Sequence, residues 1–137
     1  DEIKEVKFYK QKDQATSTGN SIYRENTKYF NDNNVIIEDR TTNTLNNILP
    51  KKKIIIDFIK IDTEGYELEV IKGISKKIFS TRYLLVEFHS KKTYKSYSPE
   101  GIHDYLIKNG FELIKTFHFP LSTFEDRIYE NINFKRI

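Results

Sequence analysis

The chain has 137 residues and 16.3 kDa, of which 37% are hydrophobic and 31% charged, enough for the core of one domain and not typical of a disordered tail. The absence of cysteine excludes disulfides, thiolate nucleophiles and zinc–cysteine centres. The net charge of +3 is small, and the lysines stand in short clusters, which argues against nucleic-acid and anionic-membrane partners.

The first third of the chain predicts two strands, a long loop and a short helix. Polar and apolar residues alternate over Glu5–Lys10, the period of a half-buried strand, and Val35–Arg40 reads as a second strand. Between them, Gln11–Asn34 is rich in Asn, Ser, Thr and Asp, which indicates a long loop. Thr44 is placed to cap a short helix that ends at Pro50.

The middle of the chain predicts a strand, a helix and a strand. Ile54–Ile61 is nearly continuously apolar, as a central parallel strand covered on both faces requires. Apolar residues recur every three or four positions from about Tyr66 to Phe79, which indicates a helix that Gly73 ends or kinks. Tyr83–Phe88 is the next strand, so the three elements have the spacing of a right-handed βαβ crossover.

The last third of the chain predicts a helix followed by two antiparallel strands. Ser98 is a helix cap followed by proline, and Gly110 takes the position where glycine ends helices. Phe111–Phe119 and Arg127–Phe134 alternate apolar and polar residues around a turn, which predicts an antiparallel pair.

No apolar stretch of the chain approaches the roughly 20 residues that span a bilayer, and the first ten residues are too polar for a signal peptide. We therefore expect a cytoplasmic location and no membrane partner.

Four polar side chains follow the two strands of the βαβ unit. Asp62 and Glu64 come directly after the first strand, and Glu87 and His89 end the second. Because side chains alternate along a strand, Glu87 and His89 lie on the same face. Ligands bind beyond the carboxyl ends of parallel strands, which lie about 5 Å apart. Such a cluster could bind a hard or borderline metal, orient an amine, or supply a general base through His89. The structural alternative is that the two acids only cap the helix, and no metal ligand is assigned.

Other candidate residues carry weaker signals. His103 and His118 are predicted to be surface or packing residues, and Tyr94 and Tyr97 flank a loop that could cover the strand ends. The five glycines are too scattered for a dinucleotide-binding turn or a phosphate-binding loop.

The segment Ile56–Gly73 contains the run Lys-Ile-Asp-Thr-Glu-Gly-Tyr-Glu and ends in Lys72-Gly73. It resembles the signature K-I-D-x-E-G-x-E-x-x-x-L-x-G of FkbM-type methyltransferases, with Ile71 in the leucine position. The similarity extends over nearly the whole chain and is most specific in residues 56–73.

This resemblance implies an α/β, Rossmann-like class I fold whose seven-stranded sheet ends in an antiparallel hairpin. It also implies an S-adenosylmethionine-dependent enzyme that methylates a hydroxyl group of a sugar or secondary metabolite. The family's glycine-rich cofactor loop belongs to units upstream of this pattern. We therefore expect residues 1–137 to be a single domain, the C-terminal portion of an N-terminally truncated methyltransferase domain.

The resemblance further implies roles for the four clustered residues. Asp62 would contact the methionine part of the cofactor or the acceptor, Glu64 and Glu87 would orient a small-molecule or glycan acceptor, and His89 is the candidate base. The alternative is a truncated, inactive binding or assembly module. In that case Ile54–Ile61 would lie at a sheet edge and favour self-association.

Overall fold

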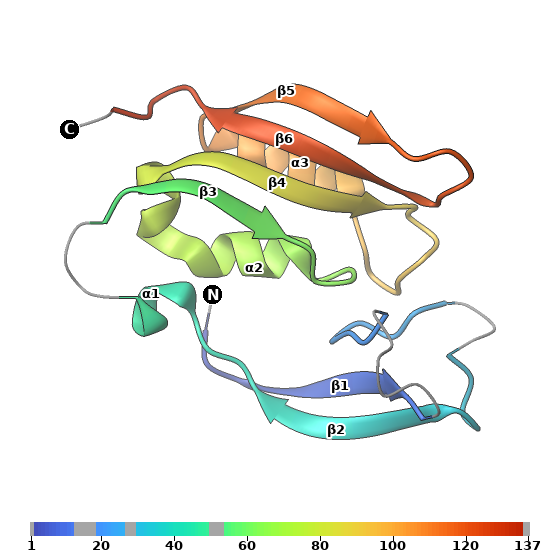
Figure 1. The fold of residues 1–137 in the computed structure, drawn as a ribbon. Helices are drawn as coiled ribbons and strands as arrows, with labels where there is room; N and C mark the ends of the chain where they lie inside the picture. Colours follow the sequence, from blue (N-terminus) through green and yellow to red (C-terminus); the bar gives the residue numbers. More distant parts are fainter. Residues whose placement is uncertain (1, 13–18, 27–29, 50–53, 136–137) are drawn as a thin grey trace.

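The computed structural model describes residues 2–12, 19–26, 30–49 and 54–135. These residues form a mixed α/β fold with two separate sheets (Figure 1). One sheet pairs strands β1 and β2, and the other contains four strands in the order β3, β4, β6, β5. Among the described residues, no helix has the length and apolar character needed to cross a membrane.

The two-stranded sheet is formed by β1 (Glu5–Gln11) and β2 (Val35–Thr41), which run antiparallel. Both strands were predicted, but their pairing into a sheet apart from the main one was not. Lys7 and Asp39, which are register partners, form a cross-strand ion pair at 2.5 Å. Opposite charges facing each other across two strands favour this register.

The short helix α1 (Leu45–Ile48) follows β2, as predicted. The hydroxyl of Thr44 accepts a hydrogen bond from the backbone N–H of Asn47 at 3.3 Å, so Thr44 is its N-cap. The predicted stop at Pro50 lies outside the described residues, as do residues 13–18 and 27–29 of the expected loop.

The predicted βαβ unit is confirmed. Strand β3 (Ile56–Ile61) leads into helix α2 (Glu67–Ile74), a 3-10 turn η1 (Ser75–Ser80) and strand β4 (Thr81–His89), which runs parallel to β3. The α-helix gives way to the 3-10 turn one residue after Gly73, so the expected irregularity is present.

The expectation that this first strand is central is wrong for the described residues. There β3 pairs only with β4 and lies at the sheet edge, and Phe58 is 51% exposed. A continuous apolar run shows only that both faces of a strand can be buried, whereas a central position also requires a second strand beside it.

The C-terminal elements are helix α3 (Pro99–Lys108) and strands β5 (Phe111–His118) and β6 (Phe124–Asn131). The Ser98 hydroxyl accepts from the Gly101 N–H at 3.1 Å, and Gly110 follows the helix with φ +82°, both as predicted. The antiparallel pair is confirmed, although its second strand begins at Phe124 rather than Arg127. Strand β6 lies antiparallel between β4 and β5.

The main core lies between the four-stranded sheet and helices α2 and α3 (Figure 1). In this sheet the described residues supply four strands rather than the seven that the resemblance implies, whereas the antiparallel strand β6 between β4 and β5 agrees with the resemblance. The most deeply buried apolar side chains come from both layers: Leu84, Val86, Phe88 and Tyr129 from the sheet, and Ile71, Ile74, Ile102 and Leu106 from the helices.

Candidate functional site

The loop from β3 to α2 has an unusual backbone. Glu64 has φ 54° and Gly65 has φ 95°, both in the region that L-residues other than glycine avoid. At Gly65 a side chain is also excluded by packing, because a Cβ there would lie 2.5 Å from Cγ of Tyr94. The strained conformation of Glu64 must therefore be held by surrounding contacts, a feature that clusters at functional sites.

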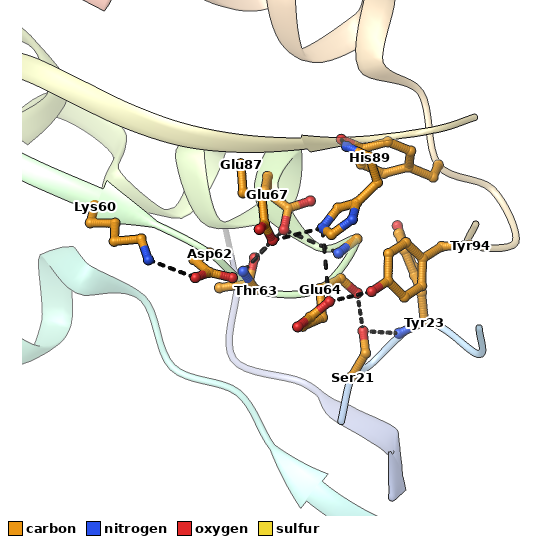
Figure 2. A network of polar contacts seen from close by, with 12 residues as sticks. Ser21, Tyr23, Lys60, Asp62, Thr63, Glu64, Glu67, Glu87, His89 and Tyr94 are labelled. Carbon is orange, nitrogen blue, oxygen red and sulfur yellow. Dashed lines mark hydrogen bonds and ion pairs between the residues drawn. The ribbon is translucent and has the colours of Figure 1, made fainter. Parts of the chain in front are cut away.

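Glu67, at the start of α2, supplies such contacts. Its side chain is fully buried, and its Oε1 accepts hydrogen bonds from the Thr63 N–H at 3.0 Å, the Thr63 hydroxyl at 3.2 Å and the Gly65 N–H at 3.1 Å (Figure 2). Burial raises the pKa of Glu67 above its ordinary value, and the backbone hydrogen bonds oppose this only in part. Glu67 thus closes the loop around its own carboxylate.

His89 lies at the carboxyl end of β4 and faces this loop (Figure 2). Its side chain is only 6% exposed, and its Nε2 is 3.0 Å from Oε2 of Glu87 and 3.8 Å from Oε2 of Glu64. Burial lowers the pKa of His89, but the carboxylates, that of Glu87 first, outweigh burial and leave the pKa above its ordinary value. The carboxylates therefore make His89 a stronger base than a free imidazole.

Two hydrogen bonds from other parts of the chain hold Glu64 (Figure 2). The Tyr94 hydroxyl donates to the Glu64 carboxylate, and the buried Ser21 hydroxyl donates to the Glu64 carbonyl oxygen. Burial raises the pKa of Glu64, and the hydrogen bond from Tyr94 offsets this only in part. The N-terminal excursion also pairs with the Tyr94 loop through a β-bridge from Glu25.

The rings of Tyr94 and Tyr97 lie edge-on to the His89 ring, with centroid distances of 5.0 and 5.9 Å. The Tyr97 hydroxyl also accepts from the His89 backbone N–H at 3.0 Å. The loop that carries both tyrosines therefore covers the end of β4, as predicted.

Asp62 lies at the border of the cluster. Its Oδ2 accepts a hydrogen bond from the Lys60 ammonium at 2.8 Å (Figure 2). Burial raises the pKa of Asp62, but hydrogen bonds to Lys60 and Glu87 and the charges of Lys60 and His89 together lower it more, so the pKa is below its ordinary value and the carboxylate stays ionised.

Two cavities meet at Asp62. A cavity of about 360 Å³ contains the side chains of Glu64, Glu87 and His89 in its lining. A second cavity, of about 670 Å³, runs beside β3 and has a mainly apolar lining that includes Ile59. Asp62 lines both, so its carboxylate can contact a ligand in either cavity.

The structure brings Glu64, Glu87 and His89 together and places Asp62 beside them, as the strand-end argument predicts. Glu67 and Ser21 were not singled out from the sequence. Glu67 is the second glutamate of the signature, which was a usable signal, whereas nothing near Ser21 in the sequence indicates its contact with residue 64.

The other two histidines lie apart from the cluster, in agreement with the prediction that they are packing or surface residues. His103 Nδ1 is 2.9 Å from the Tyr129 hydroxyl, and the side chain of His118 is 76% exposed beside Glu125.

Comparison with known proteins identifies a family for this chain. Residues 1–113 match the family model of the methyltransferase FkbM domain, and the match includes every residue of the cluster. No curated protein and no solved structure matches the chain.

Proposed function

The chain belongs to the FkbM methyltransferase family, and we propose that it transfers a methyl group from S-adenosylmethionine to a hydroxyl oxygen of a sugar or secondary metabolite. The observation that carries the proposal is the convergence of Glu64, Glu87 and His89 on one cavity at the carboxyl ends of β3 and β4. This is the edge of an α/β sheet where ligands bind.

The described residues fit part of the cofactor. Asp62 stays ionised where the two cavities meet and can accept a hydrogen bond from an ammonium group. The larger cavity offers apolar walls from Ile59 and Val70 to an aromatic base, and Glu69 adds an acceptor for hydroxyl groups. When bound, S-adenosylmethionine supplies the electrophilic methyl group.

The residues of the cluster would act on the acceptor. Transfer requires the hydroxyl oxygen to be held in line with the methyl group and to lose its proton. In this proposal Glu64 and Glu87 orient the hydroxyl, and His89 is the candidate to take up its proton. The hydrogen bond from the Tyr94 hydroxyl keeps the Glu64 carboxylate in place while the acceptor binds.

The test measures transfer of labelled methyl groups to a panel of sugars, glycans and hydroxylated metabolites by the gene product that carries this sequence. We expect His89→Ala to lower kcat by about 10²- to 10⁴-fold, the usual contribution of acid–base groups. We expect Asp62→Ala to raise KM for S-adenosylmethionine.

The matched control is His118→Ala, which removes an exposed imidazole that also pairs with a glutamate. Its kcat and KM should stay at the wild-type values. Unchanged turnover in both His89→Ala and Asp62→Ala would overturn the site assignment, and no transfer to any acceptor by the wild type would overturn the proposed reaction.

A further inference from the structure

The side chains of Glu64, Glu87 and His89 have the spacing of a metal-binding triad. One ligand atom from each lies within 4.8 Å of the others. For ligand atoms about 2.1 Å from a shared ion, separations of 3.0 and 3.8 Å from Nε2 correspond to angles of about 90° and 130° at the ion. These angles bracket the tetrahedral value, so one ion can contact all three with small side-chain rotations.

The imidazole of His89 provides a second, independent observation. Among the described residues, its Nε2 is one of the buried side-chain polar atoms without a hydrogen-bond partner, and the side chain is more than nine-tenths buried. The Glu87 oxygen lies 3.0 Å from Nε2 as an ion-pair contact, and it does not meet the geometry of a hydrogen bond. An ion in the plane of the ring would satisfy Nε2 with that oxygen beside it.

The charge around His89 also favours a cation. The cluster contains more acidic than basic groups. Its acids are the four carboxyl groups of Asp62, Glu64, Glu67 and Glu87, and its basic groups are the His89 imidazole and, at the border, the Lys60 ammonium. Buried acids in such excess are stabilised when a cation binds among them. The strained φ of Glu64 and the hydrogen bond from Tyr94 hold one carboxylate toward the same point.

From this geometry we propose that Glu64, Glu87 and His89 bind a divalent first-row transition-metal ion. The mixed donor set of one imidazole and two carboxylates suits Mn²⁺, Fe²⁺ or Zn²⁺, whereas Mg²⁺ and Ca²⁺ prefer sites made of oxygen alone. We therefore expect Mn²⁺ to bind more tightly than Mg²⁺.

The consequence for catalysis rests on the proposed function. With the ion in place, His89 is a ligand rather than the proton acceptor. The ion then lowers the pKa of an acceptor hydroxyl that binds to it, and the released proton passes to solvent water. Binding of the ion does not itself depend on turnover, so the two proposals can fail separately.

The experiment titrates the purified protein with Mn²⁺ alone and follows the signal of free Mn²⁺ by electron paramagnetic resonance. We expect one site per chain. Substitutions Glu64→Gln, Glu87→Gln and His89→Gln should each weaken affinity by at least tenfold, the lower limit for loss of even an outer partner of a metal site. The control His118→Gln, at the exposed pair with Glu125, should bind like the wild type.

Pulsed resonance on wild-type protein keeps the test decisive if a variant fails to fold. Bound Mn²⁺ should show coupling to an imidazole nitrogen. Failure of the wild type to bind Mn²⁺ at millimolar concentration, or bound Mn²⁺ without nitrogen coupling, overturns the metal site. Methyl transfer by protein that binds no metal would leave the proposed function intact, and metal binding without transfer to any acceptor would overturn only the function.

Discussion

At the scale of single residues, Glu67 is the side chain on which the loop after β3 depends most. Its carboxylate is the acceptor for two backbone N–H groups and one hydroxyl, and it has no exposure to water that could replace it. We expect Glu67→Ala to lower the free energy of unfolding by about 2–4 kcal/mol, because the N–H groups of Thr63 and Gly65 lose their acceptor. Urea denaturation measures this change.

Two further substitutions separate the lost acceptor from the lost charge. Glu67→Gln keeps one side-chain oxygen for the same donors, so it should cost less than half as much as alanine. Asp104→Ala, an exposed acid on α3, should change stability by no more than about 0.5 kcal/mol. Equal losses for alanine and glutamine at position 67 would show that the charge, not the acceptor, matters.

The sequence allowed the cluster to be predicted at this scale because its members stand at the ends of two adjacent parallel strands. The fold brings together Asp62, Glu64, Glu87 and His89, whose positions follow from strand alternation and the βαβ spacing. The contact of Ser21 with Glu64 could not be predicted, because no periodicity relates a loop residue to a partner 43 positions away.

At the scale of elements, Gly65 and Gly73 stand on either side of the start of α2 and should respond in opposite ways to alanine. Gly65 has φ 95° and no room for a Cβ beside Tyr94, whereas a Cβ at Gly73 would meet nothing within 4 Å. We expect Gly65→Ala to destabilise by about 1–3 kcal/mol from backbone strain, and more if Tyr94 cannot move. Gly73→Ala should stabilise by about 0.5–1 kcal/mol, since alanine is the better helix former.

Thermal unfolding of the two variants checks this pair. The opposite sign is the informative result, because both substitutions add the same methyl group. A stabilised Gly65→Ala variant would mean that the loop has another conformation in solution.

The positions of the helices and strands could be predicted well from local sequence, whereas the neighbours of each strand in the sheets could be predicted less well. Ser98 marks the start of α3 because its hydroxyl accepts a hydrogen bond from a free backbone N–H, and Gly110 marks its end because glycine adopts a positive φ. The bounds of α3 were therefore predicted nearly to the residue. The place of β3 at the edge depends on which other strands are present, and the separate β1–β2 sheet depends on pairing between distant segments. Neither is encoded by local patterns.

At the scale of the whole molecule, the open edge of β3 leads us to propose self-association. In the described residues β3 has a strand on one side only, and unpaired backbone groups at an edge form a template for another chain. We expect sedimentation to show concentration-dependent association. Phe58→Lys, which places a charge on this strand, should weaken it.

Phe79→Lys is the matched control, because Phe79 is similarly exposed at 58% but lies on the 3-10 turn η1 rather than on the edge strand. It should associate like the wild type. A wild-type protein that remains monomeric at all concentrations would contradict self-association through the edge of β3.

The contact between Ser21 and Glu64 also bears on the order in which the chain folds. The parallel pair of β3 and β4 closes over a short stretch of chain, whereas the cover over the cluster requires the distant N-terminal excursion to return and dock. Longer loops close at a greater entropic cost, so this docking is expected to come late. Competence for chemistry would then be the last property that a refolding molecule regains, and the first that mild denaturant removes.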